Sequence, residues 1–90
     1  MQTTQSTLKR GVVETVVTGD TFIVGGTRIR LVNVNAPQVN TEAGQMAKIK
    51  LRRLIQSKLV TYDPLSHAFD QMVANVWVDG TNVNVVMRRV

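Results

Sequence analysis

Residues 21–34 decide the fold of this chain, and they read TFIVGGTRIRLVNV. The run Thr21–Val24 is rich in β-branched and aromatic side chains and predicts a strand. Gly25–Gly26 predicts a two-residue hairpin turn, because glycine adopts a positive φ at little cost. Residues 27–34 predict the return strand, so the whole stretch is expected to form a β-hairpin.

Arg30 stands out within this return strand. Side chains alternate between the two faces of a strand, so Arg30 should point the same way as Val32 and Val34. That face is otherwise largely apolar. Because a charge on an apolar face is costly unless it is paired, we expect Arg30 to have a partner or a ligand.

The segments before the hairpin also indicate β-structure. Residues 1–6 are polar and small, and they are expected to form a frayed tail. Leu8–Val17 is rich in valine and threonine and predicts one strand. Thr18–Asp20 predicts the tight turn that leads into the hairpin.

A helix is predicted after the hairpin. Residues 35–40 contain Pro37, which cannot donate to a strand ladder, and they predict a loop. Thr41 is suited to cap a helix that runs to about Gln56. One face of this helix is apolar and the rest of its circumference is cationic. The apolar residues are Ala47, Leu51, Leu54 and Ile55, and the cations are Lys48, Lys50, Arg52 and Arg53.

The last third of the chain predicts two more strands, Leu59–Tyr62 and Met72–Val78, separated by a loop over residues 63–71. Asp79–Gly80 is a strong signal for a hairpin turn. A short final helix follows, and Asn84 is its expected N-cap.

The order of these elements predicts the fold class. Three strands, a helix, two strands and a short C-terminal helix are typical of a mainly β fold, a five-stranded Greek-key barrel of the oligonucleotide-binding (OB) type. The helix lies between the third and fourth strands. Residues 1–90 contain no repeat, low-complexity tract or linker, so one domain is expected.

Composition restricts the classes of function. The formal charge of +5 suggests an anionic partner, usually nucleic acid, although the same charge can serve solubility alone. The chain has no cysteine, which excludes disulfides, cysteine metal sites and a thiol nucleophile. No stretch approaches the roughly 20 apolar residues that cross a bilayer, and no signal-peptide pattern is visible. We therefore expect no membrane partner and a cytoplasmic location.

Several segments, in the same order, resemble the staphylococcal nuclease (thermonuclease) family. They are Gly19–Thr21, Arg30–Gln38, Gly44–Lys48 and Val76–Asn84. Together they span nearly all of residues 10–90. The resemblance implies an OB-type barrel and Ca²⁺-dependent hydrolysis of DNA and RNA phosphodiesters. Chains of that family usually continue past the position of the last residue here into a further helix.

The resemblance also assigns roles to five positions. Asp20 matches a carboxylate that binds calcium, and Arg30 matches an arginine that grips the phosphate. Asn35 stands where the family has its second calcium carboxylate. Gln38 stands where the family has the glutamate that activates water, and Gln71 replaces the second arginine.

Three of these five positions have therefore lost their charge. A side-chain amide has no basicity at neutral pH, so Gln38 cannot act as a general base. Calcium affinity follows the number of charged ligands, so Ca²⁺ is expected to bind weakly or not at all at Asp20 and Asn35. Asp20 can equally be read as a residue that stabilises its own turn. The prediction is a catalytically impaired relative of the nucleases.

Three functions compete on this evidence. The first is binding of single-stranded DNA or RNA, with phosphate contacts and one stacking aromatic supplied by Arg30, Lys9, Arg10, Lys48, Arg52 and Phe69. The helix cations can also be a solvated face, and Phe69 can simply pack under its loop. The second is a weak Ca²⁺-dependent endonuclease. The third is a protein-interaction or dimerisation module that uses an apolar C-terminal segment, Val85, Val86, Met87 and Val90.

Overall fold

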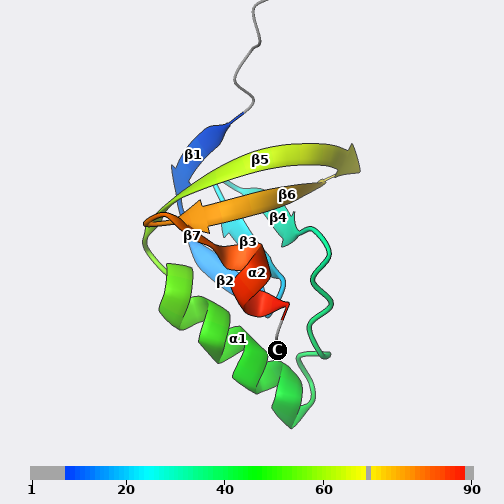
Figure 1. Ribbon diagram of the computed structural model, residues 1–90. Coiled ribbons are helices and arrows are strands. Elements are labelled where there is room, and N and C mark those ends of the chain that lie inside the picture. The colour runs from blue at the N-terminus through cyan, green and yellow to red at the C-terminus, as the bar shows by residue number, and fades with distance from the viewer. Residues whose placement is uncertain (1–7, 69, 89–90) are drawn as a thin grey trace, which may run out of the picture.

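The computed structural model describes residues 8–68 and 70–88, so the tail predicted at residues 1–6 lies outside the described residues. The described chain contains seven strands and two helices (Figure 1). In chain order they are β1 (Lys9–Val12), β2 (Thr15–Thr18), β3 (Thr21–Val24), β4 (Thr27–Leu31), α1 (Glu42–Ile55), β5 (Leu59–Ala68), β6 (Gln71–Val78), β7 (Thr81–Asn82) and α2 (Val83–Met87).

All seven strands belong to one curled sheet. Its order is β1-β5-β6-β4-β3-β2, and β7 pairs with the far end of β6. Strands β4 and β6 are parallel, and the other neighbours are antiparallel. Figure 1 shows the sheet bending round on itself, with α1 below it and α2 beside β6. The prediction of a mainly β fold with two helices is confirmed at this level.

The prediction of one strand over Leu8–Val17 is wrong, because the chain changes partner in the middle. The Val13 amide donates to the Lys58 carbonyl at 3.0 Å, whereas the Glu14 amide donates to the Ile23 carbonyl at 2.8 Å. Strand β1 therefore pairs with β5, and β2 pairs with β3. The valine pattern continues through the bend, so it does not reveal the break.

The hairpin predicted at residues 21–34 is confirmed, but its second strand is shorter than expected. Gly25 and Gly26 have φ of 56° and 79°, as a primed hairpin turn requires. Strand β4 ends at Leu31 instead of continuing to residue 34, because Asn33 adopts a left-handed φ of 60° and turns the chain away.

Helix α1 agrees with its prediction. The Thr41 hydroxyl accepts a hydrogen bond from the Gly44 amide at 3.0 Å and so caps the first turn. The helix buries Ala47, Leu51 and Ile55. These side chains join the core inside the curled sheet, which also contains Phe22, Ile29, Leu31, Val60, Val76 and Val83.

The loop predicted at residues 63–71 is largely strand, which is a correction. Strand β5 runs on to Ala68 and pairs with β6 from Thr61 to Ala68. Its pairing with β1 ends at Tyr62, so the other edge of β5 has no β1 partner beyond that point. Pro64 lies beyond the last β1–β5 pair and next to a register shift of the β5–β6 ladder, where a missing N–H is tolerated.

The C-terminal helix begins two residues earlier than predicted, and its cap is a different asparagine. The Asn82 side chain accepts from the Val85 amide at 3.0 Å, so Asn82 is the N-cap. Asn84, predicted as the cap, is fully buried inside the molecule. Neither helix in the described ranges is long and apolar enough to cross a bilayer.

Candidate functional site

The turn between β2 and β3 places Asp20 at the end of both strands. Asp20 Oδ1 accepts from the hydroxyls of Thr18 at 2.8 Å and Thr21 at 2.9 Å. Its Oδ2 accepts from the Ala36 amide at 3.1 Å. The carboxylate therefore connects the turn to the loop that follows β4. With a side chain only 15 % exposed, Asp20 does stabilise its own turn, as one reading of the sequence proposed.

Arg30, in the middle of the adjacent strand β4, points toward the same carboxylate. Its Nη2 atom lies 3.8 Å from Asp20 Oδ2, donates to Asn35 Oδ1 at 3.0 Å and donates to the Val34 carbonyl at 3.4 Å. The expectation that Arg30 has a partner is confirmed. We refer to Asp20, Arg30 and Asn35 as the Asp20 cluster.

The surroundings of Arg30 differ from those expected. Ile29 and Leu31 face the buried core, so Arg30 faces outward, and its side chain is 40 % exposed. Its neighbours in register are Thr21 on β3 and Val73 on β6. The prediction of an apolar face is wrong because residues 32–34 lie beyond the end of the strand.

The guanidinium of Arg30 is held by one of its three nitrogens. Within the described parts of the chain, each hydrogen bond and ion pair of the Arg30 side chain involves Nη2. A guanidinium has five N–H donors, of which Nη2 carries two. The Nε and Nη1 atoms therefore keep three donors, and because these two nitrogens point to opposite sides of the guanidinium, each can donate separately to an oxyanion such as phosphate.

Gln71 lies close to the Asp20 cluster but is not bonded to it. It begins β6 and is in register with Arg28 of β4, two residues from Arg30 and on the same face of the sheet. Strand geometry gives a Cα separation between Gln71 and Arg30 of roughly 8 Å. A single phosphodiester can span that separation.

Hydrogen bonds to the residue that caps α1 fix the position of Gln38. Its carbonyl accepts from both the Thr41 amide at 3.0 Å and the Thr41 hydroxyl at 2.6 Å. A Cβ at Gly44 would overlap this carbonyl, so the loop packs directly on the first turn of the helix. The Gln38 residue is exposed, and no contact joins it to the Asp20 cluster among the described residues.

The cations predicted to bind nucleic acid lie on two separate surfaces. Lys9 and Arg10 are exposed on β1, whereas Lys48 is half-buried and Arg52 exposed on α1. Figure 1 shows β1 and α1 at opposite ends of the molecule. Phe69, the predicted stacking residue, lies outside the described residues. The cations of β1 and those of α1 therefore do not lie side by side.

A candidate that the sequence argument missed is Trp77. The sheet register places it beside Thr61 on β5, and Thr61 beside Arg10 on β1. Trp77 shares the outer face with Val73 and hence with Arg30. It is half-buried there. Its neighbours Met72, Ala74, Val76 and Val78 are buried, so the alternation along β6 could have indicated that Trp77 faces outward.

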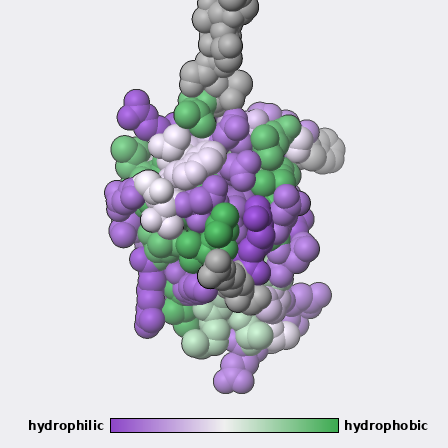
Figure 2. All heavy atoms as spheres, viewed as in Figure 1, coloured by the Kyte–Doolittle hydropathy of each residue, from purple (hydrophilic) through white to green (hydrophobic). Residues whose placement is uncertain are grey.

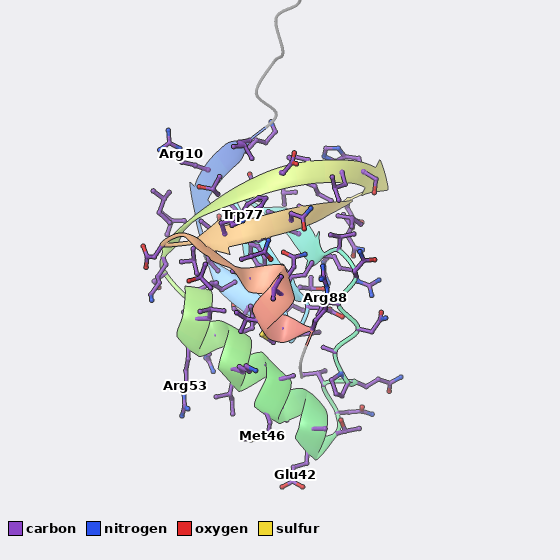
Figure 3. The ribbon with its side chains drawn as sticks, viewed as in Figure 1. Arg10, Glu42, Met46, Arg53, Trp77 and Arg88 are labelled. Atoms are coloured by element: carbon purple, nitrogen blue, oxygen red, sulfur yellow. The ribbon has the colours of Figure 1, made fainter. Side chains whose placement is uncertain are left out.

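A hollow of about 310 Å³ lies elsewhere, on α1. It is lined by Met46, Ala47, Ile49, Lys50 and Arg53 and includes no residue of the Asp20 cluster. Figure 3 shows Arg53 and Met46 on this helix, far from Arg10 and Trp77 on the upper part of the sheet.

No known family matches the chain, and no curated protein is significantly similar to it in sequence. The resemblance to the staphylococcal nuclease family therefore remains a hypothesis that depends on the residues themselves.

Proposed function

We propose that this protein is a nuclease-like OB domain that binds single-stranded DNA or RNA and does not cut it efficiently. One observation carries the proposal. The guanidinium of Arg30 is anchored through Nη2 at the outer face of the sheet, and its remaining donors are left for a phosphate.

The strand order supports the OB part of the proposal. The outermost strands, β1 and β2, are consecutive segments separated only by Val13 and Glu14. If they are counted as two halves of one bent strand, the main sheet has five strands with α1 between the third and fourth. This arrangement is compatible with a small Greek-key barrel, whose outer face binds oligonucleotides in many OB domains.

The residues that stand in the family's catalytic positions argue against efficient cutting. Asn35 is uncharged, and its amide oxygen is occupied by Arg30. Gln38 has no basicity and no contact with the Asp20 cluster in the described chain. Loss of a general base alone slows a reaction by about 10²–10⁴-fold. Binding without turnover is therefore the outcome we favour over the weak nuclease.

The outer face of the sheet offers a path for the strand. From Arg30 the face continues across β6 to Trp77, and then through Thr61 on β5 to Arg10 on β1. An indole can stack on a base of any sequence, and an adjacent arginine adds a phosphate contact. Trp77 thus takes the stacking role that the sequence argument gave to Phe69.

The test is fluorescence anisotropy with labelled single-stranded DNA and RNA, over a series of salt concentrations. Arg30→Gln is compared with Arg53→Gln, which removes the same charge from the exposed face of α1. We expect Arg30→Gln to weaken binding about tenfold, as loss of a charge-assisted hydrogen bond does. It should also reduce the slope of log K against log salt by about 0.7, the value for one phosphate contact on a single strand.

Each other outcome has a defined meaning. Equal weakening by the two variants would show that binding follows net charge alone, and a larger effect of Arg53→Gln would place the surface on α1. Absence of binding at low salt would refute the proposal. Cleavage that stops with EDTA and with Asp20→Ala would support the weak Ca²⁺-dependent nuclease instead.

The interaction-module alternative receives less support from the C-terminal segment than expected. Met87 is only 1 % exposed and belongs to the core, which corrects the prediction that it is uncovered. Val85 is 43 % exposed and Val86 is half-buried, while Val90 lies outside the described residues. Figure 2 shows hydrophobic atoms in the part of α2 that is visible, with hydrophilic atoms next to them. Light scattering that detects a stable dimer would revive this alternative.

A further inference from the structure

The Asp20 cluster already contains a cation, namely the Arg30 guanidinium. Its Nη2 lies among three oxygen atoms, Asp20 Oδ2, Asn35 Oδ1 and the Val34 carbonyl, at 3.8, 3.0 and 3.4 Å. These oxygens are of the kind that a calcium ion binds, a carboxylate, an amide and a backbone carbonyl. The same three atoms cannot serve the guanidinium and a metal ion together.

The carboxylate of Asp20 has little capacity left for a metal. It accepts three hydrogen bonds, from the Thr18 and Thr21 hydroxyls and the Ala36 amide, in addition to the Arg30 ion pair. An ionised carboxylate offers about four lone-pair sites. A metal at Oδ2 would therefore have to displace Arg30 or break the bond that fixes the loop after β4.

The ligand count points the same way. Calcium takes six to eight oxygen ligands, and tight sites contain several carboxylates. Among residues 8–68 and 70–88, no group of three or more acidic, histidine or cysteine side chains is placed to share an ion. The residues present do not fit the calcium that the family resemblance implies.

We infer that the Arg30 guanidinium is the resident cation of this site and takes the place of a divalent metal. A phosphodiester then accepts a hydrogen bond from Nε or from Nη1, with no metal bridge. Asp20 and Asn35 are positioning residues that orient the guanidinium. This inference rests on the proposed function for its ligand, but the statement about metal can be tested without nucleic acid.

The first experiment titrates the unmodified protein with CaCl₂ by calorimetry, to about 10 mM, above the dissociation constants of weak natural sites. MgCl₂ at the same concentrations is the control for ionic strength. We expect no saturable heat specific to Ca²⁺ and no specific rise in Tm. A saturable, Ca²⁺-specific signal would overturn the inference.

The second experiment tests whether Arg30 is what excludes the metal. Asn35→Asp adds the carboxylate that a calcium site needs but keeps the guanidinium, and the double variant Arg30→Gln/Asn35→Asp removes the guanidinium as well. We expect the double variant to bind Ca²⁺ at least tenfold more tightly than Asn35→Asp. Equal affinity of the two variants, or no Ca²⁺ binding by either, would show that Arg30 is not the excluding group.

The third experiment measures binding of labelled single-stranded DNA at constant ionic strength, in EDTA and in Ca²⁺. We expect the same Kd in both, and binding that needs Ca²⁺ would overturn the inference. Failure of the proposed function looks different. In that case no oligonucleotide binds under either condition, while the calcium titrations still report on the resident cation.

Discussion

Two polar clusters of this protein, one around Asn84 and one around Asp20, use similar side chains for different ends. Asn84 is fully buried, accepts from the Val76 amide at 2.8 Å and donates to the carbonyls of Val32 and Ala74 at 3.0 and 3.2 Å. All its partners are backbone groups. This amide therefore replaces ladder hydrogen bonds where β4 and β6 diverge.

The Asp20 cluster is open on one side. The Asp20 carboxylate accepts hydrogen bonds from two hydroxyls and one amide. Its charged partner Arg30 reaches solvent, and the Nε and Nη1 atoms of Arg30 have no hydrogen-bond acceptor among the described residues. A polar side chain that is buried and fully hydrogen-bonded stabilises the fold, because a ligand could bind to it only by breaking those hydrogen bonds. A charge that is oriented but incompletely bonded can bind something.

The largest expected effect is a loss of stability when the Asn84 cluster is changed. Asn84→Leu has a similar volume but leaves the Val76 amide and the Val32 carbonyl without this partner inside the protein. Each buried unsatisfied group costs about 1–3 kcal/mol, so we expect a loss of about 3 kcal/mol in the free energy of unfolding. Urea denaturation measures it. A loss below about 1 kcal/mol would contradict the structural role given to Asn84.

A smaller effect on stability is expected when the carboxylate of the Asp20 cluster is changed. Asp20→Asn keeps the shape but replaces one oxygen with a donor that cannot accept from the Ala36 amide. We expect the free energy of unfolding to fall by about 1–2 kcal/mol in the same urea experiment. Binding of single-stranded DNA should weaken no more than a few-fold, because Arg30 loses one orienting partner while a negative charge beside it is also removed. Loss of binding without unfolding would favour a metal-dependent site.

Arg30→Gln should separate stability from binding. An exposed ion pair contributes about 0–1 kcal/mol to stability, so the unfolding midpoint should change little while oligonucleotide binding weakens about tenfold. The comparison of the two clusters would fail if this variant unfolded as readily as Asn84→Leu.

The smallest stability effect is expected for Asn35→Ala. Asn35 is exposed, and among the described residues its side chain is hydrogen-bonded only to Arg30. Its removal should change the free energy of unfolding by less than about 0.5 kcal/mol, in the range of ordinary surface substitutions. Binding should weaken a few-fold, because Arg30 loses one orienting acceptor. Anisotropy and urea denaturation on the same sample would check both expectations.

Much of the local structure could be predicted from particular residues. Gly25–Gly26 marked a turn because both positions need positive φ, and Thr41 marked the start of α1 because a hydroxyl caps a free amide. The need of Arg30 for a partner followed from its charge. In each case the signal lies in one residue and its immediate neighbours.

Other features could not be predicted from single residues and their neighbours. Asn82 and Asn84 are both plausible caps, and only the packing of α2 on β6 makes one the cap and buries the other. The extension of β5 through Pro64 depends on the register shift in its ladder with β6, where a missing N–H is tolerated. That Arg30 faces outward while Val34 is buried depends on β4 ending at Leu31.

The sequence by itself determined the turn at Gly25–Gly26, the strands on either side of it and the cationic helix, since these follow from φ preferences, capping and side-chain period. It also determined that Asn35, Gln38 and Gln71 carry no charge. Only the tertiary structure decided that Asp20, Arg30 and Asn35 meet and that Lys9 and Arg52 do not. Those relations depend on strand order and register, which bring together residues distant in the chain and are not encoded in any single segment.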